Sequence, residues 1–339
     1  MPPKRSTTTR SLLGVGAALV LLAGAACSAP DESSTTASSA TAEAGALPAT
    51  ITHEYGSTTV TSAPQRVAAM GVGDADTLLS VGIHPTTIAP FGSPDQASSP
   101  WNEKLIGDSK PVVLSNSSAE FGAQIAKTLA TNPDLVTAVG AAPTREQYDL
   151  LAKTTPTIVR PADFPDWQVP WDLQAIEIGK AVGLPQAVAT KIADAKGYQA
   201  GVRGDHPEFN GKTGVVITGT PDGGVSVYGP TDGRGQMLAG YGLTFPEQLK
   251  PVITNGFYGS LSAENLNQLN AADVIVAVDW SGANDRLKAN AAFSSLPAAK
   301  AGRVVYTSQL VGNAMSVPTV LTIGWVGGQI VEPIAKALK

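Results

Sequence analysis

The chain has 339 residues, a formal net charge of −5 and a single cysteine. The acidic balance disfavours nucleic acid as a partner, because phosphate binding requires a basic surface. One cysteine allows no disulfide within the chain, so the stability of the fold must come from packing.

Residues 1–26 have the pattern of an export signal. Lys4, Arg5 and Arg10 precede an apolar run of 15 residues that ends in small residues, which is the order found in secretory signals. A membrane-spanning helix needs about 20 apolar residues, so the run predicts a cleaved signal rather than a retained anchor. Cys27 directly follows the small residues, and this arrangement resembles the lipobox of bacterial lipoproteins. The alternative is an ordinary signal peptide followed by a chance cysteine.

Residues 27–49 consist almost entirely of Ser, Thr, Ala, Glu, Gly and Pro. Such a segment cannot bury enough apolar surface to offset the entropy lost on ordering. We predict a disordered tether, anchored by a lipid on Cys27, that holds the folded part off the membrane. Removal of the signal with its three basic residues would change the net charge from −5 to −8.

Strand and helix signals alternate after the tether, which is typical of parallel-sheet α/β folds. In a first lobe at 50–184 we expect strands at 66–70, 86–91, 134–139 and 156–160, and helices at 74–82, 119–130 and 144–154. Thr144 and Gln147 hold the two positions of a capping box at the start of the last of these helices.

A long helix at 185–203 separates this lobe from a second one at 204–339. Pro185 suits a first helical position, and apolar residues follow at helical spacing, so we expect a rigid strut of about 28 Å. In the second lobe we expect strands at 213–219, 273–279 and 302–308, and helices at 235–242, 262–272 and 318–338.

Motifs for cofactors and catalysis do not fit. Residues 71–76, GVGDAD, approach a dinucleotide fingerprint, but Asp76 replaces the third glycine and carboxylates would repel pyrophosphate. The sequence contains no G-x-S-x-G elbow. Its three histidines, His53, His84 and His206, are too scattered to build a site for a bare metal ion. We expect no cofactor, no metal site and no enzymatic activity; a surface hydrolase is the alternative from a different class.

Four segments resemble the helical-backbone (cluster A, class III) periplasmic substrate-binding proteins of ABC importers, which carry ferric siderophores, haem and vitamin B12. They are residues 63–92, 227–246, 259–278 and 301–308, in the order and spacing of that family. The actinobacterial ferric-siderophore (iron-dicitrate-like) binding lipoproteins are the most similar. The resemblance implies an α/β fold with two Rossmann-like lobes, parallel-rich sheets, a single rigid helix between them and a ligand cleft between the lobes.

The resemblance also implies a function. We expect a monomeric, lipid-anchored protein on the outer face of the cell membrane that captures a ferric siderophore or related metal chelate and delivers it to an ABC permease. Haem and cobalamin are the alternative ligands, because one fold serves all three. Tyr228, Tyr258 and Met315 could supply an axial ligand to haem iron. A ferric siderophore arrives with its iron already ligated and requires no protein ligand to the metal.

The cleft should be built by loops that follow the strands. Ten residues in such positions are the predicted ligand-binding set: Phe91, Trp101, Arg160, Tyr228, Arg234, Tyr258, Trp280, Gln309, Asn313 and Met315. Aromatic surface with an occasional guanidinium suits a large, partly apolar chelate of modest charge. Arg160 is favoured because a charge at the end of an apolar strand needs a partner. The alternative for any one aromatic residue is that it covers the core of its lobe. Trp167, in the same loop as Arg160, is a weaker candidate because PDWQVPW could instead pack the crossover.

Family resemblance further implies that one acidic residue on each lobe docks onto the permease. Glu264, in LSAENL, matches the acid of the second lobe. In the first lobe the matching position aligns with Ala126, or with a small shift Gln124, and Glu120 is the nearest acid. Glu264 and Glu120 are therefore the predicted docking residues, although an acid in a first helical turn is also favoured by the helix dipole alone.

Overall fold

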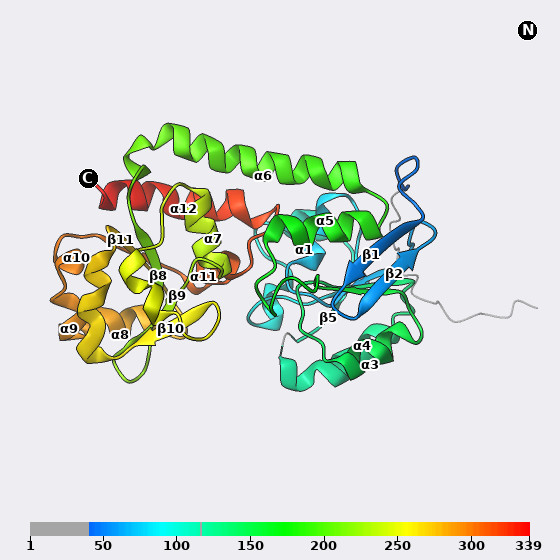
Figure 1. Ribbon diagram of the computed structural model, residues 1–339, viewed down its shortest axis with the longest axis horizontal. Helices are drawn as coiled ribbons and strands as arrows, with labels where there is room; N and C mark the ends of the chain where they lie inside the picture. The colour runs from blue at the N-terminus through cyan, green and yellow to red at the C-terminus, as the bar shows by residue number, and fades with distance from the viewer. Residues whose placement is uncertain (1–40, 116) are drawn as a thin grey trace, which may run out of the picture. The chain divides into compact units, whose positions relative to one another are not determined.

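The computed structural model describes residues 41–115 and 117–339. They form two α/β lobes, each with a five-stranded sheet, and one long helix, α6 (Pro185–Asp205), connects the lobes (Figure 1). The predicted fold class is thereby confirmed. The predicted signal and Cys27 lie outside the described residues.

The sheet of the N-terminal lobe is entirely parallel, with the strand order β5-β4-β3-β6-β7. Its strands are β3 (Val67–Ala69), β4 (Thr87–Ile88), β5 (Val112–Val113), β6 (Leu135–Ala138) and β7 (Thr157–Val159). The chain winds outward from β3 first to one side and then to the other. The direction of winding reverses between β3 and β6. Doubly wound folds bind their ligands at such a switch point, beyond the carboxyl ends of the strands.

Helices cover both faces of this sheet, which explains why its central strands are buried on both sides. On one face α1 (Asp74–Ser80) and α5 (Trp171–Ala181) pack Leu78 and Ile178 against Val67 and Leu135. On the other face α3 (Phe121–Leu129) and α4 (Arg145–Ala152) pack against the alternate residues of the same strands. The predicted capping box of α4, formed by Thr144 and Gln147, is present.

An antiparallel hairpin, β1 (Ala49–His53) and β2 (Gly56–Val60), precedes the sheet and was not predicted. The ordered contacts begin even earlier, within the predicted tether. Leu47 packs against the N-terminal core, and the backbone N–H of Glu43 donates to the carbonyl of Gly183 at 2.8 Å. The predicted boundary of the tether at residue 49 therefore lies too far along the chain.

Helix α6 begins at the predicted Pro185 and ends at Asp205 rather than at 203. Its N-cap residue, Leu184, offers no side-chain acceptor. The carboxylate of Glu43 takes that place by accepting from the backbone N–H groups of Gln186 at 2.9 Å and Ala187 at 2.8 Å. These are two of the donors that a helix leaves unsatisfied at its start. Within the described residues, no helix has the length and apolarity needed to cross a membrane.

The C-terminal lobe has a mixed sheet with the strand order β10-β9-β8-β11-β12. Its strands are β8 (Gly214–Gly219), β9 (Val225–Tyr228), β10 (Tyr258–Leu261), β11 (Val274–Val278) and β12 (Val304–Thr307). Strands β8, β11 and β12 are parallel, whereas β9 and β10 run antiparallel to their neighbours. The predicted parallel strands are present, and the antiparallel pair was missed.

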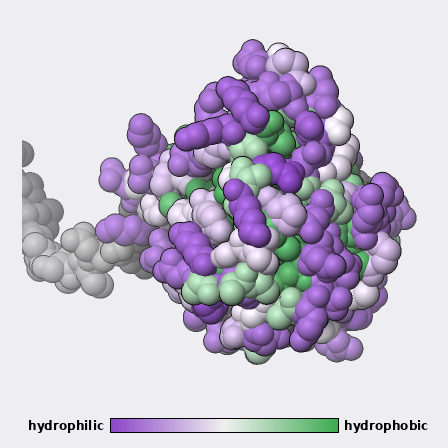
Figure 2. Space-filling model, turned by 90° about the vertical axis from the view of Figure 1, so that its left-hand side faces the viewer, coloured by the Kyte–Doolittle hydropathy of each residue, from purple (hydrophilic) through white to green (hydrophobic). Residues whose placement is uncertain are grey.

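The helices of this lobe are α7 (Gly233–Gly240), α8 (Ala283–Ala289), α9 (Ala291–Ser294), α10 (Pro297–Lys300), α11 (Gln309–Ser316) and α12 (Thr322–Ala337). The closing helix begins at Thr322 rather than at 318, and α11 was not predicted. The segment predicted as a helix at 262–272 is the 3-10 helix η5 (Ala263–Ala271). Figure 2 shows the outer end of this lobe, where hydrophilic residues cover most of the surface.

Short elements complete both lobes. They are α2 (Glu103–Ile106) and the 3-10 helices η1 (Pro94–Ala97), η2 (Ser118–Glu120), η3 (Pro207–Phe209) and η4 (Glu247–Val252).

The lobes also meet directly, away from α6. Several pairs make this contact. The hydroxyl of Thr319 donates to Asp76 at 2.9 Å, Asn313 donates to Gln96 at 2.6 Å, and the rings of Trp101 and Trp325 lie 5.1 Å apart. Together with α6, this contact fixes the walls of the space between the lobes.

Candidate functional site

A cavity of about 440 Å³ lies between the two lobes. Its volume falls in the range of about 300–1,000 Å³ that is typical of small-molecule sites. The N-terminal lobe contributes the ends of β3 and β6 and the segment from the β7–α5 loop into α5. The C-terminal lobe contributes β9, the start of α7, the start of β10 and the residues between α11 and α12.

The N-terminal wall stands at the switch point of the sheet. Val72 follows β3, and Val139 and Gly140 follow β6, its neighbour. A side chain at position 140 would collide with the carbonyl oxygen of Val72. Glycine there lets the two loops close up and form the floor of the cavity.

Aromatic side chains form a large part of the remaining wall. Six aromatic side chains line the cavity: Phe91, Trp167, Trp171, Tyr228, Phe257 and Tyr258. They come from both lobes, so a ligand held here would be sandwiched between aromatic surfaces. Such surfaces recognise large, partly apolar molecules by stacking and shape.

Among the described residues that line the cavity, Arg234 is the one basic side chain, and it is almost completely buried. Its Nη1 donates to both carboxylate oxygens of Asp232 at 3.0 Å, and its guanidinium carbon lies 3.8 Å from the centre of the Tyr228 ring. Nε is buried with no acceptor, and Nη2 donates to no described residue. The guanidinium is thus held rigidly while some of its donors stay unused.

Asp232 has two structural roles at the start of α7. Its Oδ1 accepts from the backbone N–H of Arg234 at 2.9 Å, which caps the helix. Burial raises the pKa of Asp232, and the charge of Arg234 opposes this rise. The pair therefore presents little net charge to the cavity.

Gln174, on α5, faces the cavity from the opposite lobe. Its Nε2 donates to the carbonyl of Val72 at 2.9 Å and to Asp74 at 2.7 Å. Asp74 is itself fully buried, accepts from the backbone N–H groups of Val139 and Gly140, and has its pKa raised by burial. Because both hydrogens of the Gln174 amide are used, its Oε1 is left as a hydrogen-bond acceptor.

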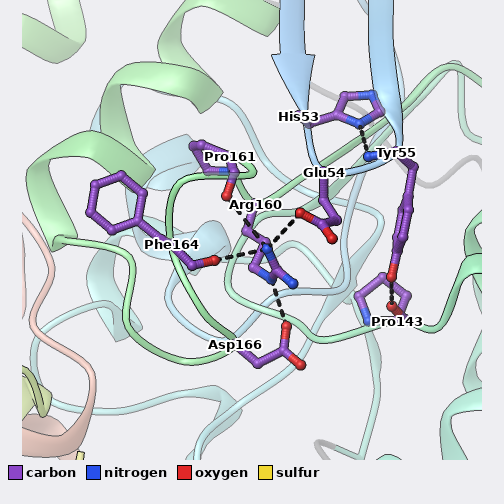
Figure 3. A network of polar contacts seen from close by, with 8 residues as sticks. All are labelled: His53, Glu54, Tyr55, Pro143, Arg160, Pro161, Phe164 and Asp166. Carbon is purple, nitrogen blue, oxygen red and sulfur yellow. Dashed lines mark hydrogen bonds and ion pairs between the residues drawn. The ribbon is translucent and has the colours of Figure 1, made fainter. Parts of the chain in front are cut away.

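Of the ten predicted binding residues, the cavity wall contains Phe91, Tyr228, Arg234 and Tyr258. The placement of Arg160 in the cleft is wrong. Its side chain donates to Glu54 at 3.1 Å and to Asp166 at 2.5 Å (Figure 3), and these partners belong to its own lobe. The charge at the end of β7 does have a partner, as argued, but the partner is protein.

Five further predicted residues also lie outside the cavity wall, for identifiable reasons. Trp280 packs behind it, with its ring 5.8 Å from that of Phe91, and Trp101 packs against Trp325. Gln309, Asn313 and Met315 were expected in a loop but belong to α11. There Met315 is fully buried in the core of the C-terminal lobe, and Asn313 binds Gln96.

Sequence reasoning missed several lining residues, among them Asp232, Gln174, Trp171 and Phe257, and it ranked Trp167 as a weaker candidate that was left out of the predicted set. A signal was available for the two tryptophans. They stand in PDWQVPW, where prolines break the chain between a buried strand and a helix. Prolines of this kind favour an extended loop at the sheet edge, and such loops carry ligand contacts.

The predicted docking acids are both exposed. Glu264 occupies the first turn of η5, and Glu120 is the N-cap residue of α3. Hydrogen bonds to its own backbone N–H and to Ser262 lower the pKa of Glu264, which keeps it charged. Across residues 41–115 and 117–339, no group of three or more His, Cys, Asp or Glu side chains could hold a metal ion.

The family profile described as periplasmic binding protein matches residues 75–310, and the chain belongs to this family. The predicted family is therefore confirmed, and the chain is a solute-binding protein rather than an enzyme. No curated protein sequence matches the chain.

Solved structures agree with this assignment. A periplasmic solute binding protein from Mycobacterium smegmatis is 26% identical, with a TM-score of 0.74 over 86% of this chain and 99% of that one. PiaA of Streptococcus pneumoniae in complex with ferrichrome is 25% identical, with a TM-score of 0.72 over 85% and 98%. Staphylococcus aureus SirA, complexed with staphyloferrin B, is 18% identical with a TM-score of 0.68 over 84% and 98%, which shows the shared fold.

Proposed function

We propose that this chain is a membrane-tethered extracytoplasmic binding protein that captures a ferric siderophore between its lobes and delivers it to an ABC importer. The observation that carries the proposal is the interlobe cavity, with six aromatic side chains around one buried arginine that has unused donors. The similarity to PiaA, an iron uptake binding protein whose structure contains ferrichrome, supports the same class of ligand.

The charges of the wall favour a chelate with little net charge. Arg234 is neutralised by Asp232, and no other charged residue in the described part of the chain lines the cavity. A highly anionic chelate would meet no net positive charge in this wall and would lose its hydration to the aromatic side chains. A neutral ferric hydroxamate avoids both costs, while its iron-ligating oxygens still carry enough negative charge to accept from Nε and Nη2 of Arg234.

Gln174 adds a second criterion. Its Oε1 can accept a hydrogen bond but its amide nitrogen is fully engaged. A ligand is therefore favoured if it carries an N–H or O–H group on the side that faces the N-terminal lobe, as a peptide-based hydroxamate does. Together, Arg234 and Gln174 select for a chelate with acceptors on one side and a donor on the other.

The cavity wall offers few side chains that could act as axial ligands to haem iron. Met315 is buried in the core, and none of the three histidines lines the cavity. The ring of Tyr228 is covered by Arg234, and its hydroxyl lies 3.3 Å from that of Thr218. Tyr258 remains as a single candidate axial ligand, so the cavity favours a chelate whose metal is already coordinated.

Delivery and anchoring complete the proposal. Glu264 and Glu120 would dock onto basic residues of the permease, one on each lobe. A lipid on Cys27 would hold the protein at the outer face of the membrane, since two or more acyl chains anchor a protein stably. The chain enters the N-terminal lobe at Glu43, beside the start of α6, so the tether would emerge there.

Tryptophan fluorescence tests the capture step, because Trp167 and Trp171 line the cavity. The protein is titrated with ferrichrome, ferric dicitrate, haem and cobalamin. We expect submicromolar quenching by ferrichrome and much weaker binding of ferric dicitrate. Tight haem binding with a shifted Soret band, and no response to either chelate, would reassign the protein to haem capture.

A further inference from the structure

The loop at 161–170, between β7 and α5, carries Trp167 and Val169 to the cavity wall. It has no regular secondary structure. Its backbone forms two long hydrogen bonds within the loop, from the N–H of Phe164 to the carbonyl of Pro161 at 3.3 Å and from the N–H of Gln168 to the carbonyl of Pro165 at 3.2 Å. Ordering a loop costs about 1–2 kcal/mol per residue. Something outside the loop must hold it in place.

Arg160 makes those contacts (Figure 3). On the loop side its Nε donates to Asp166 at 2.5 Å and its Nη1 to the carbonyl of Phe164 at 2.8 Å. On the other side Nη1 donates to Glu54 at 3.1 Å, and the backbone N–H of Glu54 donates back to the carbonyl of Arg160 at 2.9 Å. Arg160 thus fastens the loop to the β1–β2 turn. Only 15% of the Arg160 side chain is exposed, whereas the carboxylate side chain of Asp166 is 52% exposed, so solvent still screens part of this ion pair.

The residue directly after Asp166 is Trp167, which adopts a left-handed backbone with φ 66°. A bulky residue pays a steric penalty in this conformation, which persists where surrounding contacts determine it. Across the mouth of the cavity, a Cβ at Gly256 would lie 3.2 Å from Nε2 of Gln168. The loop therefore reaches the segment of the C-terminal lobe that carries Phe257.

We propose that Arg160 is a positioning residue: through Asp166 it holds Trp167 at the cavity wall, where the indole retains the bound ligand. This proposal rests on the proposed function for the nature of the ligand. It gives the arginine a role without any contact to the chelate, and it predicts that loosening the loop acts on ligand release.

The first test needs no ligand. Asp166→Asn removes the charge that meets Arg160 Nε, and Asp149→Asn is the matched control, because Asp149 pairs with Arg145 in the same lobe and the two carboxylate side chains are 52% and 54% exposed. Hydrogen–deuterium exchange of residues 161–170 is compared in the whole protein. We expect exchange to rise at least about fivefold in Asp166→Asn and to stay unchanged in the control. Equal exchange in both variants would overturn the proposal.

The second test is a double-mutant cycle on the dissociation rate of ferrichrome. We expect Asp166→Asn and Trp167→Ala each to accelerate release about tenfold, and the double variant to release no faster than Trp167→Ala alone. If the two substitutions accelerate release additively, Asp166 does not act through Trp167, and the proposal is overturned. If the wild-type protein does not bind ferrichrome at all, the proposed function fails, while the exchange experiment still decides whether Arg160 holds the loop.

Discussion

Asp76 lies in the contact between the lobes and accepts a hydrogen bond from Thr319 there. It is a buried carboxylate without a basic partner among the described residues, so its ionisation should change the stability of the protein. It accepts from Asn102 Nδ2 at 3.1 Å and from the hydroxyl of Thr319 at 2.9 Å, with a further side-chain hydrogen bond from Trp101. Burial raises the pKa of Asp76 from 3.8 to about 6, against the lowering effect of these donors. The perturbation we suggest is Asp76→Asn, which keeps the shape but cannot ionise.

The pH dependence of the free energy of unfolding follows from the difference between the folded and unfolded pKa values of Asp76. Between the unfolded pKa of 3.8 and the folded pKa of about 6, the folded state keeps a proton that the unfolded state has lost. The contribution of Asp76 to the free energy of unfolding is therefore greatest below this window and falls as the pH rises through it. A difference of about 2 pKa units corresponds to about 3 kcal/mol, which Asn at this position would not lose.

Urea denaturation of both proteins, from about pH 4 to about pH 7, measures this effect. Asn must turn one amide hydrogen towards donors, so we expect the variant to be the less stable protein at the acidic end. Between the acidic end and neutral pH, the free energy of unfolding of the variant should rise by about 3 kcal/mol relative to that of the wild type. Other buried acids, such as Asp74 and Asp232, titrate in both proteins and cancel. A difference that stays constant with pH would refute the reasoning.

Three further outcomes are expected. Glu43→Ala should lower the free energy of unfolding by about 1 kcal/mol, measured by urea denaturation, because it removes the side-chain cap that Glu43 provides at the start of α6; no change would mean that this segment does not support the helix. Glu264→Arg should leave ferrichrome affinity intact and impair cellular uptake of the iron chelate, whereas normal uptake would argue against docking through this residue. Cys27→Ala should move the protein from the membrane to the soluble fraction or stall its processing; a membrane-bound, fully matured variant would contradict the lipid anchor.

The alternation of strands and helices, and the strut at Pro185, were predictable because they depend on local signals. Apolar strands, capping residues and helix-terminating glycines are read over a few neighbouring positions. The α11 helix was missed although its N-cap, Ser308, is a recognisable start signal. Its eight residues include a glycine and give only about two turns of pattern, which is too little to separate a helix from a loop.

The contacts that individual side chains make in the folded protein were harder to predict. Arg160 is satisfied by Glu54, which lies 106 positions away in the sequence, and only the folded structure shows that the hairpin brings the two together. Arg234 was predicted as a binding residue from its place in a Gly-rich loop, but its ion pair with Asp232, two positions away, was missed. Burial and unused donors, which make Arg234 the centre of the proposed site, depend on both lobes.

Calorimetric titration with ferrichrome gives the most direct test of the central claim. The wild-type protein is compared with the double variant Asp232→Asn/Arg234→Gln, which removes both charges and so leaves no unpaired carboxylate buried in the wall. We expect submicromolar binding to the wild type and at least tenfold weaker binding to the variant, a loss of about 1.4 kcal/mol or more. Equal affinities, or no binding to the wild type, would contradict the account.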